Sequence, residues 1–383
     1  MKSRSAGLLL LALSVSLCGG DGGQQSEPSS VRKRSEPPVI RSSWDDLLEG
    51  VHSAEDWGKR RQLLKERYLD LIRDRYKPAK PPLDLKVHES AVVDGAYTRQ
   101  LVSYNVEADE RASAYLGIPL HLDGKAPAVV ALHGTYKEGK RHPAGLEGDP
   151  DKAHLDHLCR RGYVVIAPDH FVAGDRIPPE GPYETARFYQ KHPQWTAVGK
   201  FTYEHSIAVD VLQSLEQVDP KRVGALGHSL GGHGTFFLAA YDERIKVAAC
   251  NCGASFFRHN PNVEAWARDH WYVYLKHIRP GLLEGRLPPI DFHEIIALIA
   301  PRAFLDLSGL NDGTGGTQRQ RVLMLLRIMD VYELEGAPQN FAFYVHGRGH
   351  SVAHESRQLM YAWMDTHLKP PPATKTKLVT DAD

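Results

Sequence analysis

The chain has 383 residues, of which 42% are hydrophobic and 25% charged. This composition is typical of a globular protein, and the length suffices for one large α/β domain or two smaller ones. Lys plus Arg and Asp plus Glu both number 47, and this zero formal net charge argues against nucleic acid or an anionic membrane as the main partner. The four cysteines do not make a disulfide framework, and we expect Cys250 and Cys252 to be small core residues.

The first segment, MKSRSAGLLLLALSVSLCGG, places Lys2 and Arg4 before an apolar stretch that ends in small residues. The stretch is too short to span a membrane comfortably and predicts a secretory signal over residues 1–19. We therefore expect export to the periplasm or the medium. Cys18 leaves open a lipid anchor at a new N-terminus, and a disordered apolar tail on a cytosolic protein is the alternative interpretation.

The next segments indicate where the folded domain begins. Gly, Ser, Pro and charged residues dominate residues 20–42, which predicts a disordered linker. SWDD, from Ser43, predicts a helix start, and a second helix is predicted over residues 55–74, with basic residues such as Arg61 and Lys65 on a solvated face. The predicted boundaries are a signal peptide over 1–19, a linker over 20–42, a domain over 43–370 whose helical extension spans 43–80, and a flexible tail over 371–383.

From residue 86 the apolar pattern changes to that of strands. KVHESAVV, YTRQLVSYNV and ASAYLGIPL predict an antiparallel entry. Short apolar runs, each followed by a helical stretch, come next, at residues 126–134, 163–169, 222–227, 246–253, 302–309 and 341–347. This alternation indicates an α/β fold with a mostly parallel central sheet flanked by helices. Segments 170–203 and 254–290 interrupt it, and we expect them to be lid-like insertions over the carboxyl ends of the strands, where ligands bind.

Ser229 lies in GHSLG, between the apolar run RVGALG and the helix start GHGTFFLAAY. Gly227 and Gly231 stand two positions before and after it. A tight strand-to-helix turn brings these positions together, so a side chain at either would clash, and the pattern predicts a nucleophile elbow. An oxyanion hole needs two backbone N–H donors: we expect Leu230, at the helix N-terminus, and Thr135, in the loop after APAVVALHG.

Six motifs follow one another along the chain: ALHGT, GYVVIAPD, VDPKRVGALGHSLGGHG, AAYDERIKVAACNCG, IAPRAFLDLSGLNDG and GRGHS. With them, residues 86–368 resemble the dienelactone hydrolase-like and acetyl xylan esterase-like branch of the α/β-hydrolase superfamily. The resemblance implies an α/β-hydrolase fold and an exported serine carboxylesterase without a metal or organic cofactor. True dienelactone enzymes carry a cysteine nucleophile, so the serine at position 229 points to ordinary ester hydrolysis.

In the chain order of this superfamily, the acid and the histidine follow the serine, each on a loop after a later strand. Asp312 follows RAFLDLSG, and His350 follows FAFYVHG. We therefore expect His350 to activate Ser229 as a base and Asp312 to orient His350. The competing Asp306 lies within its predicted strand and would point into the sheet.

Four histidines, His133, His170, His228 and His233, and Trp195 are candidates for the substrate pocket, and for each histidine a structural role is an equal alternative. Trp195, Trp266 and Trp271 could form an aromatic platform for a sugar or an aryl ester, or could simply pack the insertions. HLDH, at residues 154–157, matches part of a metallo-hydrolase motif. Position 152 is lysine where that motif needs histidine, so we expect a polar helix face there and no metal site.

The resulting hypothesis is a serine hydrolase that cleaves a short-acyl or acetylated-carbohydrate ester through a Ser-His-Asp triad and an acyl-enzyme. Its expected partner is a small-molecule or carbohydrate ester, with no nucleic acid and no membrane span. A prolyl oligopeptidase-like peptidase is an alternative, but it normally carries a large β-propeller for which the segment before Lys86 leaves no room. The other alternative is a non-catalytic binding protein on a hydrolase scaffold, which the loss of a triad residue would indicate.

Overall fold

The computed structural model describes residues 44–259, 263–313 and 318–369, which belong to one unit of the chain. The predicted signal peptide, linker and flexible tail lie outside the described residues, as does Ser43. In the described part of the chain, no helix is both long enough and apolar enough to cross a membrane.

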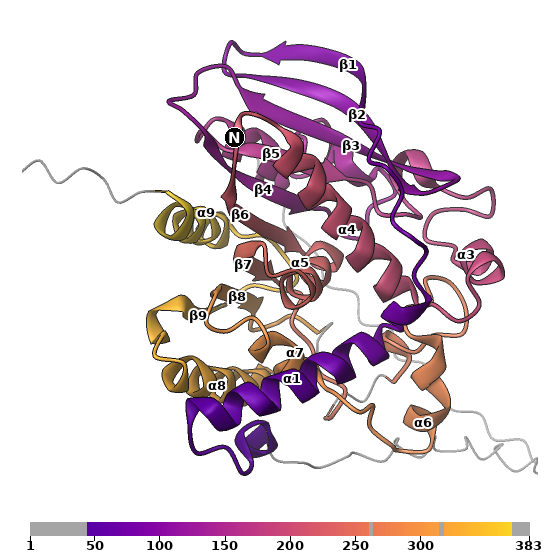
Figure 1. Cartoon of the computed structure of the whole chain (residues 1–383), viewed down its shortest axis with the longest axis vertical. Coiled ribbons are helices and arrows are strands. Elements are labelled where there is room, and N and C mark those ends of the chain that lie inside the picture. The colour runs from indigo at the N-terminus through magenta and orange to yellow at the C-terminus, as the bar shows by residue number, and fades with distance from the viewer. Residues whose placement is uncertain (1–43, 260–262, 314–317, 370–383) are drawn as a thin grey trace, which may run out of the picture. The chain divides into compact units, whose positions relative to one another are not determined.

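The described residues form a nine-stranded sheet in the order β1-β2-β3-β5-β4-β6-β7-β8-β9 (Figure 1). The strands are β1 (Lys86–Val93), β2 (Tyr97–Glu107), β3 (Glu110–Pro119), β4 (Ala126–Leu132), β5 (Val164–Pro168), β6 (Val218–His228), β7 (Ile245–Asn251), β8 (Ala303–Gly309) and β9 (Phe341–His346). The pairs β1–β2, β2–β3 and β3–β5 are antiparallel, and every later pair is parallel. The predicted mostly parallel sheet with an antiparallel entry is confirmed.

Helices cover both faces of the sheet. The α-helices are α1 (Ala54–Leu71), α2 (His154–Cys159), α3 (Ala186–Lys191), α4 (Ala197–Ser214), α5 (Leu230–Tyr241), α6 (Arg279–Leu283), α7 (Phe292–Ala297), α8 (Gln318–Leu334) and α9 (His354–Leu368). The 3-10 helices are η1 (Trp44–Leu48), η2 (Asp74–Tyr76), η3 (Gly139–Arg141), η4 (Pro150–Lys152), η5 (Gly174–Arg176), η6 (Val263–Ala265), η7 (Lys276–Ile278) and η8 (Pro338–Asn340).

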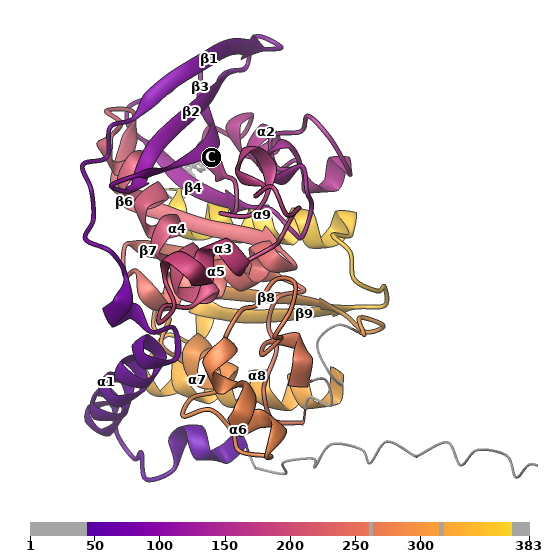
Figure 2. The ribbon, with the colours of Figure 1, turned by 90° about the vertical axis from the view of Figure 1, so that its right-hand side faces the viewer.

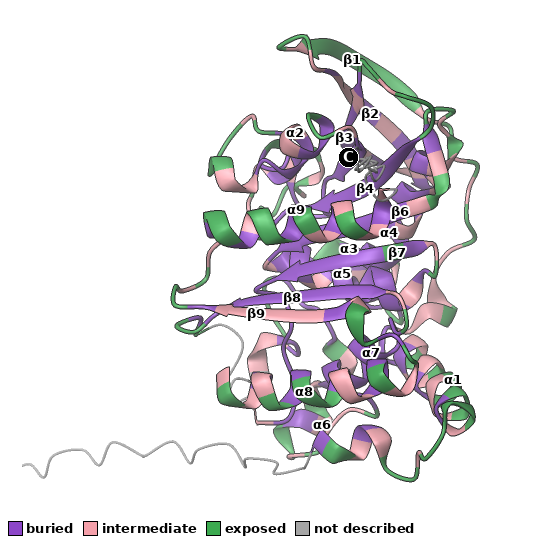
Figure 3. Ribbon diagram, turned by 90° about the vertical axis from the view of Figure 1, so that its left-hand side faces the viewer, coloured by how far each residue is buried: buried purple, intermediate pink, exposed green. Residues whose placement is uncertain are grey.

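Two hydrophobic clusters, one on each face, hold these layers together. Leu155 of α2 and Met364 of α9 pack with Val129 and Leu226 of the sheet on one face. Residues of α1, α4, α5, α7 and α8 pack on the other. Figure 3 shows the central strands almost wholly buried, while the helices alternate buried and exposed residues. Burying one large apolar side chain contributes about 1.5–3 kcal/mol, so the sheet is a rigid base for the loops at its edge.

The N-terminal helix α1 supports the helix that follows Ser229. The Ser53 hydroxyl accepts from the Asp56 N–H at 3.1 Å and begins α1. The Lys65 ammonium donates to the carbonyl oxygens of Ala240 and Tyr241, at 2.5 and 2.9 Å, where α5 ends. A cation at a helix C-terminus is favourable, so this basic side chain has a structural role. The prediction of a solvated basic face was wrong at this position, because α1 packs on α5 with that side.

The HLDH segment also differs from its prediction. His154 is buried, and its Nδ1 lies 2.9 Å from the Tyr361 hydroxyl of α9. His157 places its Nδ1 3.0 Å from the same hydroxyl. The two histidines therefore join α2 to α9. The sequence predicted a polar helix face, but α2 turns this side toward α9.

The two insertions contact each other. The Tyr272 N–H donates to the carbonyl oxygen of Tyr183 at 2.9 Å, and the Trp271 indole donates to that of Pro182 at 3.2 Å. The Tyr189 hydroxyl donates to the carbonyl oxygen of Val273 at 2.9 Å. Figure 2 shows α3 of the first insertion and α6 of the second on the face turned to the viewer. The first insertion thus supports the second.

Candidate active site

Ser229 occupies a strained turn between β6 and α5. Its φ of 58° and ψ of −117° lie outside the regions that L-residues favour, which costs on the order of 1–3 kcal/mol. Two backbone hydrogen bonds hold this conformation: the Ser229 N–H donates to Asn251 O, and the His233 N–H donates to Ser229 O, both at 2.9 Å. The turn therefore fixes the backbone from which the Ser229 hydroxyl projects.

The two flanking glycines are required by close backbone approaches. A Cβ at Gly227 would lie 2.5 Å from the carbonyl carbon and oxygen of Gly231, which confirms the predicted approach of these two positions. A Cβ at Gly231 would collide instead with the carbonyl group of Leu132 at the end of β4. The elbow is thus packed against the neighbouring strand as well as against itself.

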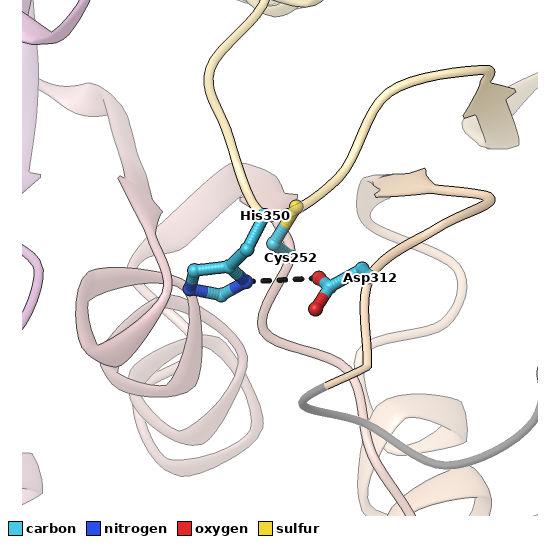
Figure 4. Close-up of side chains that lie close together, drawn as sticks. All are labelled: Cys252, Asp312 and His350. Atoms are coloured by element: carbon cyan, nitrogen blue, oxygen red, sulfur yellow. Dashed lines mark hydrogen bonds and ion pairs between the residues drawn. The ribbon is translucent and has the colours of Figure 1, made fainter. Parts of the chain in front are cut away.

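A chain of hydrogen bonds joins Ser229, His350 and Asp312. His350 Nε2 lies 2.8 Å from Ser229 Oγ, and His350 Nδ1 lies 2.9 Å from Asp312 Oδ2 (Figure 4). An ionised carboxylate only accepts hydrogen bonds, so the proton of the neutral ring is on Nδ1. Nε2 is then free to accept the hydroxyl proton of Ser229, which is the arrangement of an activated serine.

The loops after β8 and β9 bring the acid and the histidine to this place. Asp312 follows β8 and is 3% exposed, while His350, after β9, reaches solvent. The competing Asp306 points into the protein: it is 1% exposed, and burial raises its pKa to about 6. Asp306 is not among the residues that line the cavity at Ser229.

The two expected oxyanion donors flank this chain. Leu230 is the first residue of α5, so its N–H has no carbonyl partner within the helix. Thr135 lines the same cavity as Ser229 and His350. The loop that carries Thr135 is held by His133, whose Nδ1 donates to Gly134 O at 2.6 Å and whose Nε2 accepts from the His170 N–H at 2.9 Å.

Four of the side chains that the sequence suggested for the substrate pocket lie behind it. His133, His170, His228 and Trp195 are all buried, and none lines the cavity at Ser229. The His170 ring lies 2.7 Å from the Tyr272 hydroxyl, and Trp195 packs against Phe188 and Tyr203. These four assignments are corrected: the residues support the loops and insertions around the site, since short runs of sequence do not show which side of a loop faces the ligand.

His228 nevertheless touches the proposed base. Its ring centroid lies 4.8 Å from that of His350, and its Nδ1 lies 2.7 Å from Asn251 Oδ1. Burial, helped by the nearby His350, lowers the pKa of His228 to about 3. His228 is therefore neutral at neutral pH and adds no positive charge beside His350.

The cavity over Ser229 has a volume of about 180 Å³ and an aromatic wall. Four aromatic residues of the second insertion line it: Trp266, Trp271, Tyr272 and Tyr274. Two of the three tryptophans named from the sequence thus reach the site, and Trp195 does not. His233, Ser255, Arg268 and Arg321 also line the cavity and give it polar groups.

Cys252 is a residue that sequence reasoning assigned to the core. It has a φ of 51° after β7 and lies in the site beside Asp312 and His350 (Figure 4). One ligand atom from each of the three lies within 4.8 Å of the others, so they could hold a metal ion only in competition with the hydrogen bonds just described. Burial and the neighbouring Asp312 raise the pKa of the Cys252 thiol to about 12, so it remains protonated.

Comparisons with known proteins find esterases and hydrolases among the matches. Residues 179–325 match the model of the family described as "Glucuronyl esterase, fungi". The hydrolase YtaP of Bacillus subtilis (strain 168) is 29% identical over 68% of this chain and 86% of its own length. The carbohydrate esterase MZ0003, from an unknown prokaryotic organism, is 29% identical over 31% of this chain and 29% of its own length.

A solved structure extends the similarity to most of the fold. The glucuronoyl esterase from Solibacter usitatus superposes with a TM-score of 0.67 at 19% identity, covering 87% of this chain and all of that one. The chain has the α/β-hydrolase fold. The matched family model indicates a carboxylic ester hydrolase. In this α/β-hydrolase fold the second insertion lines the cavity at Ser229.

Proposed function

We propose that this α/β-hydrolase cleaves carboxylic esters of carbohydrates with Ser229 as nucleophile, His350 as general base and Asp312 as the acid that orients His350. The observation that carries the proposal is the hydrogen-bond chain from Ser229 Oγ through His350 to Asp312. The glucuronyl esterase match and the carbohydrate esterase relative support the sugar part of the substrate.

Acylation begins when Ser229 Oγ attacks the acyl carbon and His350 Nε2 takes the hydroxyl proton. The carbonyl oxygen becomes an oxyanion, to which the N–H groups of Leu230 and Thr135 donate hydrogen bonds. Each such donor contributes about 10²–10³ in rate. The imidazolium then returns its proton to the leaving alkoxide, and Asp312 remains ionised and stabilises the positive ring.

Deacylation uses the same groups. Water attacks the acyl-enzyme, His350 removes a proton from it, and the proton passes to Ser229 Oγ as the acid leaves. The neutral ring of His228 is helpful in both half-reactions, because a second cation 4.8 Å from His350 would oppose formation of the imidazolium.

The aromatic wall is the part of the site that would receive the sugar. Trp266 and Trp271 present large rings next to Ser229, and sugar rings stack their C–H faces on such surfaces. The cavity has a volume of about 180 Å³, which favours a short acyl group at Ser229. We therefore assign a small acyl group, such as acetyl, to the cleaved ester.

Labelling with a fluorophosphonate tests the proposal directly. We expect the folded protein to form one adduct, on Ser229, and to hydrolyse short acyl esters of sugars. Ser229→Ala should abolish both labelling and turnover while its melting temperature stays close to that of the parent. A folded parent that forms no adduct, or a Ser229→Ala variant that keeps most of the esterase activity, would show that the mechanism is wrong.

Export is a separate part of the proposal. The basic and apolar order of residues 1–19 supports a secretory signal, which would place the enzyme in the periplasm or the medium. N-terminal sequencing of the protein from fractionated cells tests this. A mature chain that begins after residue 19 in the exported fraction is expected, and an intact N-terminus in the cytosol would contradict it.

A further inference from the structure

The cavity beside Ser229 presents polar groups that the proposed mechanism does not use. In the part of the chain that the structure describes, Nε and Nη1 of Arg321, Oγ of Ser255 and Nδ1 of His233 are buried atoms without a hydrogen-bond partner. All three residues line the same cavity as Ser229. Because buried polar groups are nearly always hydrogen-bonded, these atoms point to a ligand that completes them.

Arg321 gives this group of atoms its charge. The side chain enters the site from α8, is 2% exposed, and donates from Nη2 to the carbonyl oxygen of Ala254. That bond fixes the guanidinium and leaves three of its N–H donors, one on Nε and two on Nη1, without an acceptor. A buried cation with open donors is costly, so an anion that binds there gains affinity from both charge and hydrogen bonds.

Asp306 does not satisfy Arg321. The two charges interact, but neither oxygen of Asp306 has a hydrogen-bond partner among the described residues. Burial raises the pKa of Asp306 to about 6 in spite of Arg321. A close ion pair would instead lower this pKa, so the guanidinium is not held by its protein neighbour in the way that a buried ion pair requires.

The neighbours of Arg321 suit a carboxylate. The hydroxyl of Ser255 can donate one hydrogen bond, and the ring of His233 can donate another. Burial lowers the pKa of His233 to about 3, so it contributes a hydrogen bond and no charge. Arg268 also lines the cavity, with its guanidinium carbon 5.2 Å from the ring centroid of Trp271, and adds a second positive group.

We propose that the cavity binds a free carboxylate of the substrate through Arg321, Ser255 and His233 while Ser229 cleaves an ester elsewhere on the same molecule. The inference rests on the proposed function and names its substrate class: an O-acylated acidic sugar, such as an acetylated uronate. A sugar whose own carboxyl group is esterified presents no charge to Arg321 and is a poorer substrate.

Three matched acetyl esters test the inference: acetylated glucuronate, its methyl ester and acetylated glucose, each followed by release of acetate. For the parent chain we expect kcat/KM to be about 10- to 100-fold higher for the free acid than for either neutral ester, the size of one charge-assisted interaction. Equal kcat/KM values for the three esters would overturn the carboxylate subsite. So would release of methanol from the methyl ester that is faster than release of acetate. Neither result would contradict the esterase function.

Substitutions at Arg321 test whether this residue causes the preference for the free acid. Arg321→Gln should reduce the acid-to-neutral ratio of kcat/KM to near one, and Arg321→Lys should keep part of it. Arg319→Gln, on the exposed side of the same helix, is the control and should keep the full ratio. An Arg321→Gln variant that lowers all three rates equally shows a structural role and overturns the proposal. If Arg321→Gln does not fold, the proposal is tested by the acid-to-neutral ratio of kcat/KM in the parent chain and in Arg321→Lys. A parent chain that cleaves none of the esters and forms no fluorophosphonate adduct overturns both proposals.

Discussion

The ring of His228 packs against the ring of His350, with centroids 4.8 Å apart and ring planes 43° apart. The residue before the nucleophile therefore contacts the proposed base. Its hydrogen bond to Asn251 anchors it to β7, the strand next to the elbow. This contact ties the position of the His350 loop to the sheet.

The first prediction concerns this contact. His228→Gln keeps a neutral side chain that can still bond to Asn251, so we expect kcat/KM to fall by less than about tenfold, the worth of roughly 1 kcal/mol. Because the pKa of His228 is about 3, the shape of the pH profile between pH 5 and 9 should not change. Steady-state kinetics across that range measures both. Loss of an ionisation from the profile would contradict the assignment of the base to His350.

The second prediction separates the two carboxyl groups near the site. Asp312→Asn should lower kcat by about 10⁴, because the ring of His350 is then no longer held in the tautomer that accepts from Ser229. Asp306→Asn, outside the cavity, should lower kcat by less than about tenfold. Kinetics on a short acyl ester compares them, with the fluorophosphonate labelling rate as a second readout. A larger loss of kcat in Asp306→Asn than in Asp312→Asn would instead assign the role of the acid to Asp306 in β8.

The third prediction is a dependence of stability on pH that comes from Asp306. Its folded-state pKa of about 6 exceeds the ordinary 3.8, so the folded state binds more protons between these values and the contribution of Asp306 to stability falls as pH rises through this window. Asp306→Asn removes this pH-dependent contribution. Its stability relative to the parent should rise by about 1–3 kcal/mol between pH 4 and pH 7, at about 1.4 kcal/mol per pKa unit. Denaturant titration at both pH values measures the difference, and a constant difference would contradict it.

The fourth prediction concerns Gly231, the glycine two positions after the nucleophile. Gly231→Ala places a methyl group against the carbonyl of Leu132, which should destabilise the protein by about 1–3 kcal/mol and displace the start of α5. Turnover should fall with it, because the N–H of Leu230 moves. Gly58→Ala is the matched control: this exposed position in α1 has nothing within 4 Å of an added Cβ. It should stabilise by about 0.5–1 kcal/mol. Equal effects of the two substitutions would show that the contact at Leu132 does not matter.

The fifth prediction is that acid destabilises the protein. Burial lowers the pKa of His154, His205, His228 and His233 to about 3. These groups are neutral in the folded state but bind protons below pH 6.5 when unfolded, so stability falls as pH drops from about 6.5 toward 3, by up to about 1.4 kcal/mol per pH unit for each. Denaturant titrations at pH 7, 6 and 5 should show this. The slope should be shallower in His205→Gln, and an unchanged slope would contradict the contribution of His205.

The sequence by itself determined the sheet and the positions on its edge. Six nearly continuous apolar runs and the three segments of the antiparallel entry predicted nine strands. All nine are present, because these patterns depend on local periodicity alone. The spacing of Gly227, Ser229 and Gly231 specified the turn, since only glycine fits such close backbone approaches. Chain order then placed Asp312 and His350 on two loops at the same edge of the sheet.

Only the tertiary structure decided what surrounds these groups. The aromatic wall comes from an insertion without periodicity, and its course depends on contacts with the other insertion, such as that between Tyr272 and Tyr183. Arg321 stands in a helix with other basic residues and could not be distinguished from a solvated side chain, while Cys252 had the composition of a core strand. Their burial beside Ser229 follows from the packing of segments far apart in the chain, which no local pattern encodes.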